Sequence, residues 1–135
     1  MGTRCKIEFQ EKRTDYNINR RTVYKHWDGC PEVMIPMLEK FLKQDGRAGD
    51  VEYQTANFLY WAKKETGEHD SGYGVCLNDS ITTELSYFYE VITEQAEKGK
   101  TIIKVYQIVF DNPEQGWNLK KENLELIDTV EIEKE

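Results

Sequence analysis

The sequence predicts an α+β fold in which an antiparallel sheet of about five strands packs two helices on one of its faces. The first observation is a change of hydrophobic period. Apolar and polar residues alternate near the N-terminus, whereas apolar residues recur every three or four positions between 31 and 66. The second is a return, after position 72, to segments rich in aromatic and β-branched residues, which are typical of strands. The predicted element order is ββααβββ, followed by a C-terminal extension.

One domain is predicted for residues 1–110, with residues 111–135 as an acidic C-terminal extension. A chain of 135 residues buries about 68% of its unfolded surface, so folding requires neither disulfides nor a structural metal. The segment LIDTVEI, within the extension, is a candidate for one further strand.

The N-terminal residues are predicted to form an antiparallel hairpin. Apolar and polar residues alternate over residues 5–10 (CKIEFQ), which indicates a half-buried strand. Residues 21–27 (RTVYKHW) are rich in β-branched and aromatic side chains and are predicted as the second strand. Residues 11–20 are polar and contain turn formers, so they are predicted as a connecting loop that is long for a hairpin.

Two helices are predicted between positions 31 and 67. Apolar residues of the first recur at helical spacing: Val33, Met34, Met37, Leu38, Phe41 and Leu42. Pro36 lies inside this pattern, and because proline has no N–H, a helix that begins at about Glu32 is favoured over a kink. The second helix has Asp50 as a plausible N-cap and ends at Gly67. It carries two apolar stripes, which indicates that it is covered on two sides.

The remaining predicted elements are strands. The segment GYGVCLN is short and contains two glycines, which favours an edge strand or a bulge. The segments ELSYFYEVI and TIIKVYQIVF are joined by the polar stretch TEQAEKGK, and this arrangement predicts an antiparallel pair.

Charge and composition limit the expected partners and location. The net charge of −7 argues against nucleic acid as a partner, because phosphate contacts require lysine and arginine. No apolar run is long enough to span a membrane, and the first residues lack the apolar segment of a signal peptide. Three cysteines without a Cys-x-x-Cys pair indicate reduced thiols, and hence a cytoplasmic protein without a zinc site or a disulfide framework.

The stretch YKHWDGCP, residues 24–31, is the candidate functional segment. Its structural interpretation is a strand that turns into a helix. Glycine accepts the positive φ of a sharp turn, so Gly29 is expected to supply it. The Asp28 carboxylate is expected to accept hydrogen bonds from backbone N–H groups at the start of the helix after Pro31.

The functional interpretation of the same segment is a site for a small anion. Strand periodicity places Tyr24, His26 and Asp28 on one face. The start of a helix beside Gly29 would favour a phosphate or carboxylate group. These four residues are the candidate ligand-binding residues, with His26 as general acid or base and Asp28 orienting it. Cys30 is a weaker candidate, as a nucleophilic thiol at a helix N-terminus. No cofactor or metal is predicted, and His69 is expected to be exposed.

The chain resembles a family of small uncharacterised proteins from archaea, bacteria and phages. That family carries the pattern Y-[KR]-H-x-D-G-Y-P after an N-terminal strand, and six residues match it: Tyr24, Lys25, His26, Asp28, Gly29 and Pro31. Cys30 departs from the pattern, because the family has an aromatic residue there. The resemblance covers residues 2 to about 110 and implies no activity; a mobile-element or host-conflict setting follows from it by association alone.

Two functional hypotheses follow, because the sequence alone leaves the function unknown. The first is a non-enzymatic binding or protein-interaction module that self-associates or binds a protein partner. It rests on eight tyrosines, five phenylalanines and three tryptophans in a chain without a complete catalytic signature. The alternative is an enzyme that acts on a small phosphate- or carboxylate-bearing molecule through His26 and Asp28.

Overall fold

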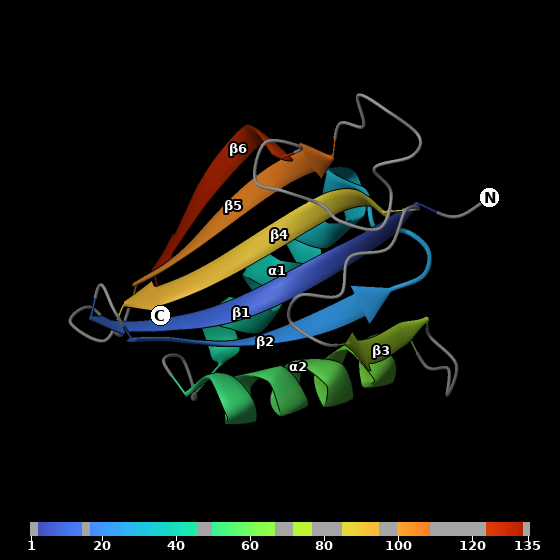
Figure 1. Cartoon of the computed structure of the whole chain (residues 1–135). Helices are drawn as coiled ribbons and strands as arrows, with labels where there is room; N and C mark the ends of the chain where they lie inside the picture. The colour runs from blue at the N-terminus through green and yellow to red at the C-terminus, as the bar shows by residue number, and fades with distance from the viewer. Residues whose placement is uncertain are drawn as a thin grey trace.

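Eight elements follow one another along the described part of the chain (Figure 1). The computed structural model describes residues 3–14, 17–45, 50–66, 72–76, 85–94, 100–108 and 124–133. The elements are β1 (Arg4–Thr14), β2 (Asn17–Lys25), α1 (Pro31–Gln44), α2 (Val51–Thr66), β3 (Tyr73–Cys76), β4 (Leu85–Glu94), β5 (Lys100–Ile108) and β6 (Leu124–Glu133). The predicted α+β class is confirmed.

The strands form one sheet with the order β3-β2-β1-β4-β5-β6. It has six strands rather than the predicted five, because β6 lies in the acidic extension and pairs with β5. The prediction of an antiparallel sheet is wrong for one pair, since β1 and β4 run parallel. Both helices lie between β2 and β4 in the sequence, and such a crossover allows a strand to return parallel to an earlier one.

The β1–β2 hairpin is confirmed, but its strands are longer than predicted. Residues 11–20 were predicted as a loop, whereas β1 continues to Thr14 and β2 begins at Asn17, with which Thr14 pairs. Glu11 lies opposite Asn19 in the same ladder. Backbone hydrogen bonds hold these polar residues in strands, although their side chains give no apolar alternation.

Both helices pack on the same face of the sheet, as predicted. The ring of Phe9, in the middle of β1, contacts Phe41 of α1 at a centroid distance of 6.4 Å and Phe58 of α2 at 5.3 Å. Behind the strands in Figure 1, α1 crosses the sheet, and α2 runs beside β2 and β3. The core therefore lies between this face and the two helices, and it includes Ile7, Met34, Leu38, Val91, Ile103 and Val105.

The helix starts agree with the sequence. α1 begins at Pro31, the position where the missing N–H of proline does no harm, and contains Pro36. α2 begins after Asp50, whose carbonyl accepts a 2.8 Å hydrogen bond from the Gln54 N–H. Neither of the described helices combines the length and the apolar character that crossing a membrane requires.

Candidate functional site

The candidate segment lies at the corner between the end of β2 and the start of α1. Tyr24 Oη and His26 Nδ1 share a 2.8 Å hydrogen bond, and the His26 ring is exposed to solvent. The ring of Trp27 meets that of His26 edge-on, with centroids 5.4 Å apart. The backbone N–H of His26 donates to the Gly72 carbonyl at 2.8 Å, which ties this corner to the residue before β3. Tyr24 and His26 are thus brought together as the sequence predicted.

Asp28 has a different role from the one predicted. Its φ of 56° places it in the left-handed region, which was assigned to Gly29. The N-cap residue of α1 is Cys30, and no side-chain hydrogen bond caps the helix. The prediction that the Asp28 carboxylate caps α1 is therefore wrong. A capping side chain belongs to the N-cap residue itself, and Asp28 lies two positions before it. Among the described residues, no hydrogen bond joins Asp28 to His26.

The left-handed backbone at Asp28 can be tested by stability. A non-glycine residue in this region is strained, and aspartate tolerates it better than alanine does. We expect Asp28→Ala to lower the free energy of unfolding by about 1 kcal/mol, and Asp28→Gly to leave it unchanged or raise it slightly. Chemical denaturation of both variants measures this. A loss of stability in Asp28→Gly as large as that in Asp28→Ala would contradict the backbone explanation and restore a role for the carboxylate.

Gly29 is required for close packing rather than for a special φ. Its N–H donates to the Thr3 carbonyl at 2.8 Å, and its carbonyl accepts a 2.7 Å hydrogen bond from the buried Tyr89 hydroxyl. A Cβ at this position would lie 2.8 Å from Cys5 Cβ. The corner is thereby fixed to β1 and to β4. The role of Tyr89 was not predicted, because nothing local in the sequence links position 29 to position 89.

The start of α1 offers little to an anion. Pro31 has no N–H, and the N–H groups of Val33 and Met34 donate to the Cys30 carbonyl at 3.1 and 2.9 Å. Glu32 already places a negative charge in the first turn, where it meets the positive end of the helix dipole. Fewer free N–H groups are therefore available beside Gly29 than the sequence predicted.

Lys25 is the buried charged residue that sequence reasoning missed at this corner. Its side chain points to the helix face of the sheet, and the residue is only 3% exposed. The Nζ atom lies 3.5 Å from Met34 Sδ and 4.9 Å from the centroid of the Tyr73 ring. No carboxylate forms an ion pair with it in the described part of the chain. Strand alternation with the buried Val23 was the signal that could have revealed it.

The surroundings of Lys25 disfavour its charged form. Burial lowers the pKa of the Lys25 ammonium, and the nearby Cys5, Asp28 and Cys30 oppose this lowering without cancelling it. Burial also raises the pKa of the Cys5 thiol to about 12, so that thiol is protonated at neutral pH. The half-buried Cys30 is the N-cap residue, and its proposed nucleophilic role stays a prediction.

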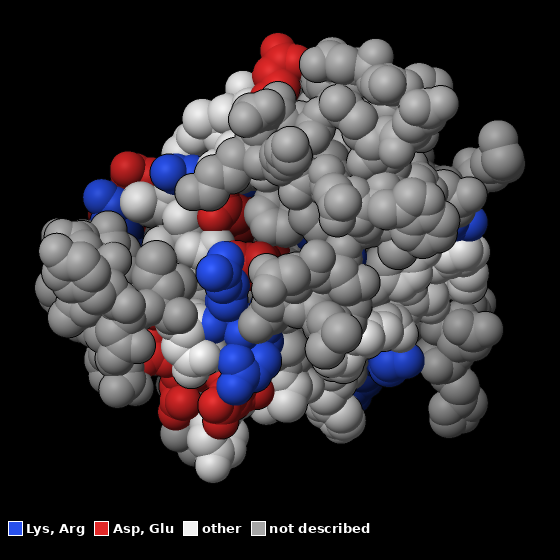
Figure 2. Space-filling view, viewed as in Figure 1, with Lys and Arg blue, Asp and Glu red and all other residues white. Residues whose placement is uncertain are grey.

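The sheet face turned away from α1 carries a polar network, and Figure 2 shows acidic and basic side chains together on this side of the molecule. Gln10 Nε2 donates to Glu8 Oε1 at 2.7 Å and also to the Glu90 carboxylate. Arg20 Nη1 lies 3.7 Å from the same Glu8 oxygen. Burial raises the pKa of Glu8, and the charge of Arg20 opposes that rise. The polar groups of this network are hydrogen-bonded or ion-paired to one another, so we assign the network a structural role.

The outer face of α2 is exposed, although the sequence predicted that this helix is covered on two sides. Tyr53 is 56% exposed and Tyr60 is 70% exposed. Ala56 and Asn57 lie between them and are also exposed. We call these four residues the tyrosine face. The other stripe of the helix is buried, and its Phe58 ring packs against Phe41 and Tyr73.

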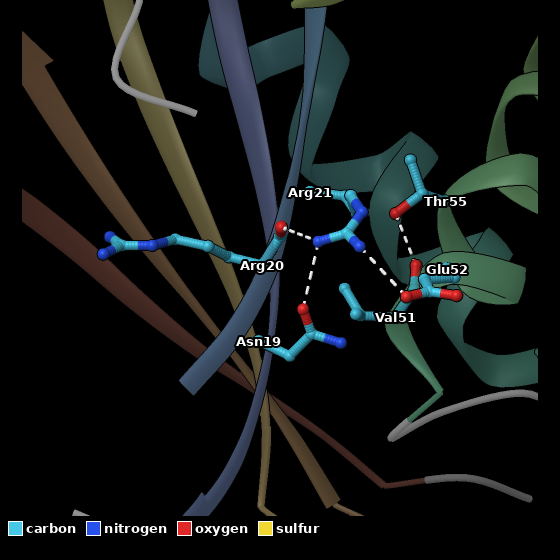
Figure 3. Close-up of polar contacts among 6 residues, drawn as sticks. All are labelled: Asn19, Arg20, Arg21, Val51, Glu52 and Thr55. Carbon is cyan, nitrogen blue, oxygen red and sulfur yellow. Dashed lines mark hydrogen bonds and ion pairs between the residues drawn. The ribbon is translucent and has the colours of Figure 1, made fainter. Parts of the chain in front are cut away.

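An ion pair fixes the first turn of α2 to the sheet (Figure 3). Arg21 reaches from β2 and donates from Nη2 to Glu52 Oε1 at 3.0 Å. Its Nη1 atom donates to Asn19 Oδ1 at 3.0 Å and to the Arg20 carbonyl at 2.7 Å. These two contacts within β2 therefore orient the guanidinium group that binds Glu52 of the helix.

The chain matches no protein-family model, no curated protein sequence and no solved structure. The resemblance carried by residues 24–31 thus stays a prediction. Among the described residues, no three His, Cys, Asp or Glu side chains are grouped so that they could hold a metal ion. His69 lies outside the described residues.

Proposed function

We propose that the protein is a non-enzymatic protein-interaction module that binds its partner through the tyrosine face of α2. The observation that carries this proposal is the exposure of Tyr53 and Tyr60 two helical turns apart on one face. Tyrosine combines a large apolar ring with a hydroxyl group, and it is enriched at the centres of protein interfaces. If these two rings belonged to the core of the chain, they would be buried.

The contacts that join α2 to β2 and to α1 support the same proposal. Arg21 binds Glu52 in the first turn, and Lys40 of α1 lies 3.1 Å from Glu65 in the last turn. Phe58 is fully buried between these two points. A face held in this way loses little conformational freedom on binding, and this favours association.

The alternative function, an enzyme that uses His26 and Asp28 on a small anion, has one observation in its favour. The His26 ring is exposed and Tyr24 orients it. Two observations weigh against it. Asp28 makes no hydrogen bond to His26 among the described residues, and the start of α1 has few N–H groups available for a phosphate or carboxylate.

Affinity capture tests the proposed function. The tagged chain is mixed with lysate of cells that also express an untagged copy, and the retained proteins are identified by mass spectrometry. We expect at least one protein, the untagged copy or another, to be retained by the wild type and by His26→Ala but lost with the double variant Tyr53→Ser/Tyr60→Ser. If the double variant retains the same proteins in the same amounts, the tyrosine face is not the binding surface.

A further inference from the structure

We infer that the partner of the tyrosine face is a second copy of this chain, packed antiparallel across a two-fold axis between Ala56 and Asn57. This inference rests on the proposed function and names its partner. Tyr53, Ala56, Asn57 and Tyr60 are spaced by three, one and three positions, so the spacing of the face is the same in both directions and a tyrosine stands at each end. A two-fold interface requires such self-complementarity. When a residue of one copy contacts a second residue of the other copy, the same contact occurs again with the two copies exchanged.

The geometry of an antiparallel pair follows from this spacing. With the axis between Ala56 and Asn57, Tyr53 of one copy faces Tyr60 of the other, and the same contact occurs at the opposite end. The crossing point brings Ala56 of each copy opposite Asn57 of the other, and the small alanine side chain allows the two helices to approach closely. Each pair of tyrosine rings can then pack in an offset or edge-on arrangement, as aromatic pairs prefer.

The charges of α2 favour the antiparallel over the parallel arrangement. Glu52 lies in the first turn, whereas Lys63 and Lys64 lie in the last turn, where the acidic Glu65 is already paired with Lys40 of α1. An antiparallel pair brings the acidic end of each helix to the basic end of the other, and it also aligns the two helix dipoles favourably. The Lys64 ammonium already lies 5.9 Å from the centroid of the Tyr60 ring, so a cation is in place at this end of the face. A parallel pair would oppose like charges at both ends.

The exposed apolar residues of β6 are less suited to contact a second copy. β6 exposes Leu126 and Ile127 at the edge of the sheet, but Glu125, Asp128, Glu131 and Glu133 share that strand. Pairing two copies of β6 would bring carboxylates together, which is destabilising in a sheet. The tyrosine face has no carboxylate among its four residues.

Sedimentation velocity measures the association. The face covers two helical turns, which is small for an interface, so we expect a dimer that dissociates in the micromolar range. The weight-average mass of the wild type should rise from that of a monomer to that of a dimer between about 1 µM and about 500 µM. Tyr53→Ser/Tyr60→Ser should weaken the association at least about tenfold. Val75→Ser, which alters an exposed apolar residue on β3, is the matched control and should leave it unchanged.

Cysteine cross-linking tests the axis. Ala56→Cys lies beside the axis and should form a disulfide-linked dimer under mild oxidation, whereas Lys64→Cys, at the far end of the helix, should not. The wild type, treated in the same way, corrects for its own three cysteines. Cross-linking of both variants would indicate a parallel pair and overturn the geometry. A monomer at every concentration would overturn self-association itself. If capture still depends on the two tyrosines in that case, the proposed function stands with a different protein as the partner.

Discussion

We expect Gly29→Ala to lower the free energy of unfolding by about 2–4 kcal/mol. The added methyl group would lie 2.8 Å from Cys5 Cβ, 2.9 Å from Cys5 Sγ and 2.9 Å from the Thr3 carbonyl oxygen. The corner would have to move away from β1, and this movement would stretch its hydrogen bonds to Thr3 and Tyr89. Urea denaturation of the variant and the wild type measures the difference.

Gly74→Ala is the matched control for this substitution. Gly74 lies on β3, and a Cβ there meets no atom within 4 Å. We expect its effect to stay within about 0.5 kcal/mol, as for surface changes elsewhere. If Gly29→Ala were as mild as the control, the corner could move without loss, and the close approach of Gly29 to β1 would not be a source of stability.

The second large effect is expected from Lys25→Met. Methionine is unbranched and only one heavy atom shorter than lysine, and it removes the buried charge, so we expect the variant to be more stable by about 1–3 kcal/mol near neutral pH. The sulfur atoms of the buried Met34 and the partly buried Met37 around Nζ are suitable neighbours for a thioether. Lys100→Met, at a partly exposed lysine of β5 that is paired with Glu131, is the control and should change stability by less than about 1 kcal/mol.

The gain from Lys25→Met should depend on pH in a defined direction. Burial lowers the pKa of Lys25 in the folded protein below its ordinary value. Between these two pKa values the unfolded chain binds more protons than the folded one, so the contribution of Lys25 to stability rises with pH. The advantage of the variant is therefore largest at pH 6 and shrinks towards pH 10. The titration of Cys5 differs little between the two folded proteins over this range, because burial raises the pKa of its thiol to about 12.

A variant less stable than the wild type at every pH would contradict this account. It would show that the contact of Nζ with the Tyr73 ring and the two sulfur atoms outweighs the burial of the charge. Attraction of a desolvated ammonium to an aromatic ring reaches about 2 kcal/mol, so the experiment decides between two effects of similar size.

The sequence predicted the elements of the fold better than their arrangement. Periodicity identified α1, α2 and most strands because it records which side of each element is buried. It carries no information on which strand lies beside β1, so the parallel pairing of β4 was missed. Residues 11–20 were misjudged for a related reason. Backbone hydrogen bonding makes residues 11–14 and 17–20 strands, and their side chains do not reveal it.

The candidate segment was predicted as a corner correctly, but the roles within it were exchanged. Asp28 has the positive φ that glycine was expected to supply, and Gly29 provides the close approach to Cys5. Both roles depend on the position of β1, which a local motif does not specify. Lys25 shows the same limit. Its alternation with Val23 places it on the buried face, while its neighbours Met34 and Met37 come from another element.

The parallel pairing of β1 with β4 also governs how the molecule can be built during synthesis. The β1–β2 hairpin is local and can form within microseconds of leaving the ribosome, whereas the contact of Gln10 with Glu90 joins residues 80 positions apart. At ordinary translation rates, the intervening chain takes on the order of 4–16 s to appear. For that time one edge of the hairpin is open, and it can pair with any extended chain nearby. The nascent protein is thus most prone to aggregate before β4 emerges, at a stage when the finished sheet gives no protection.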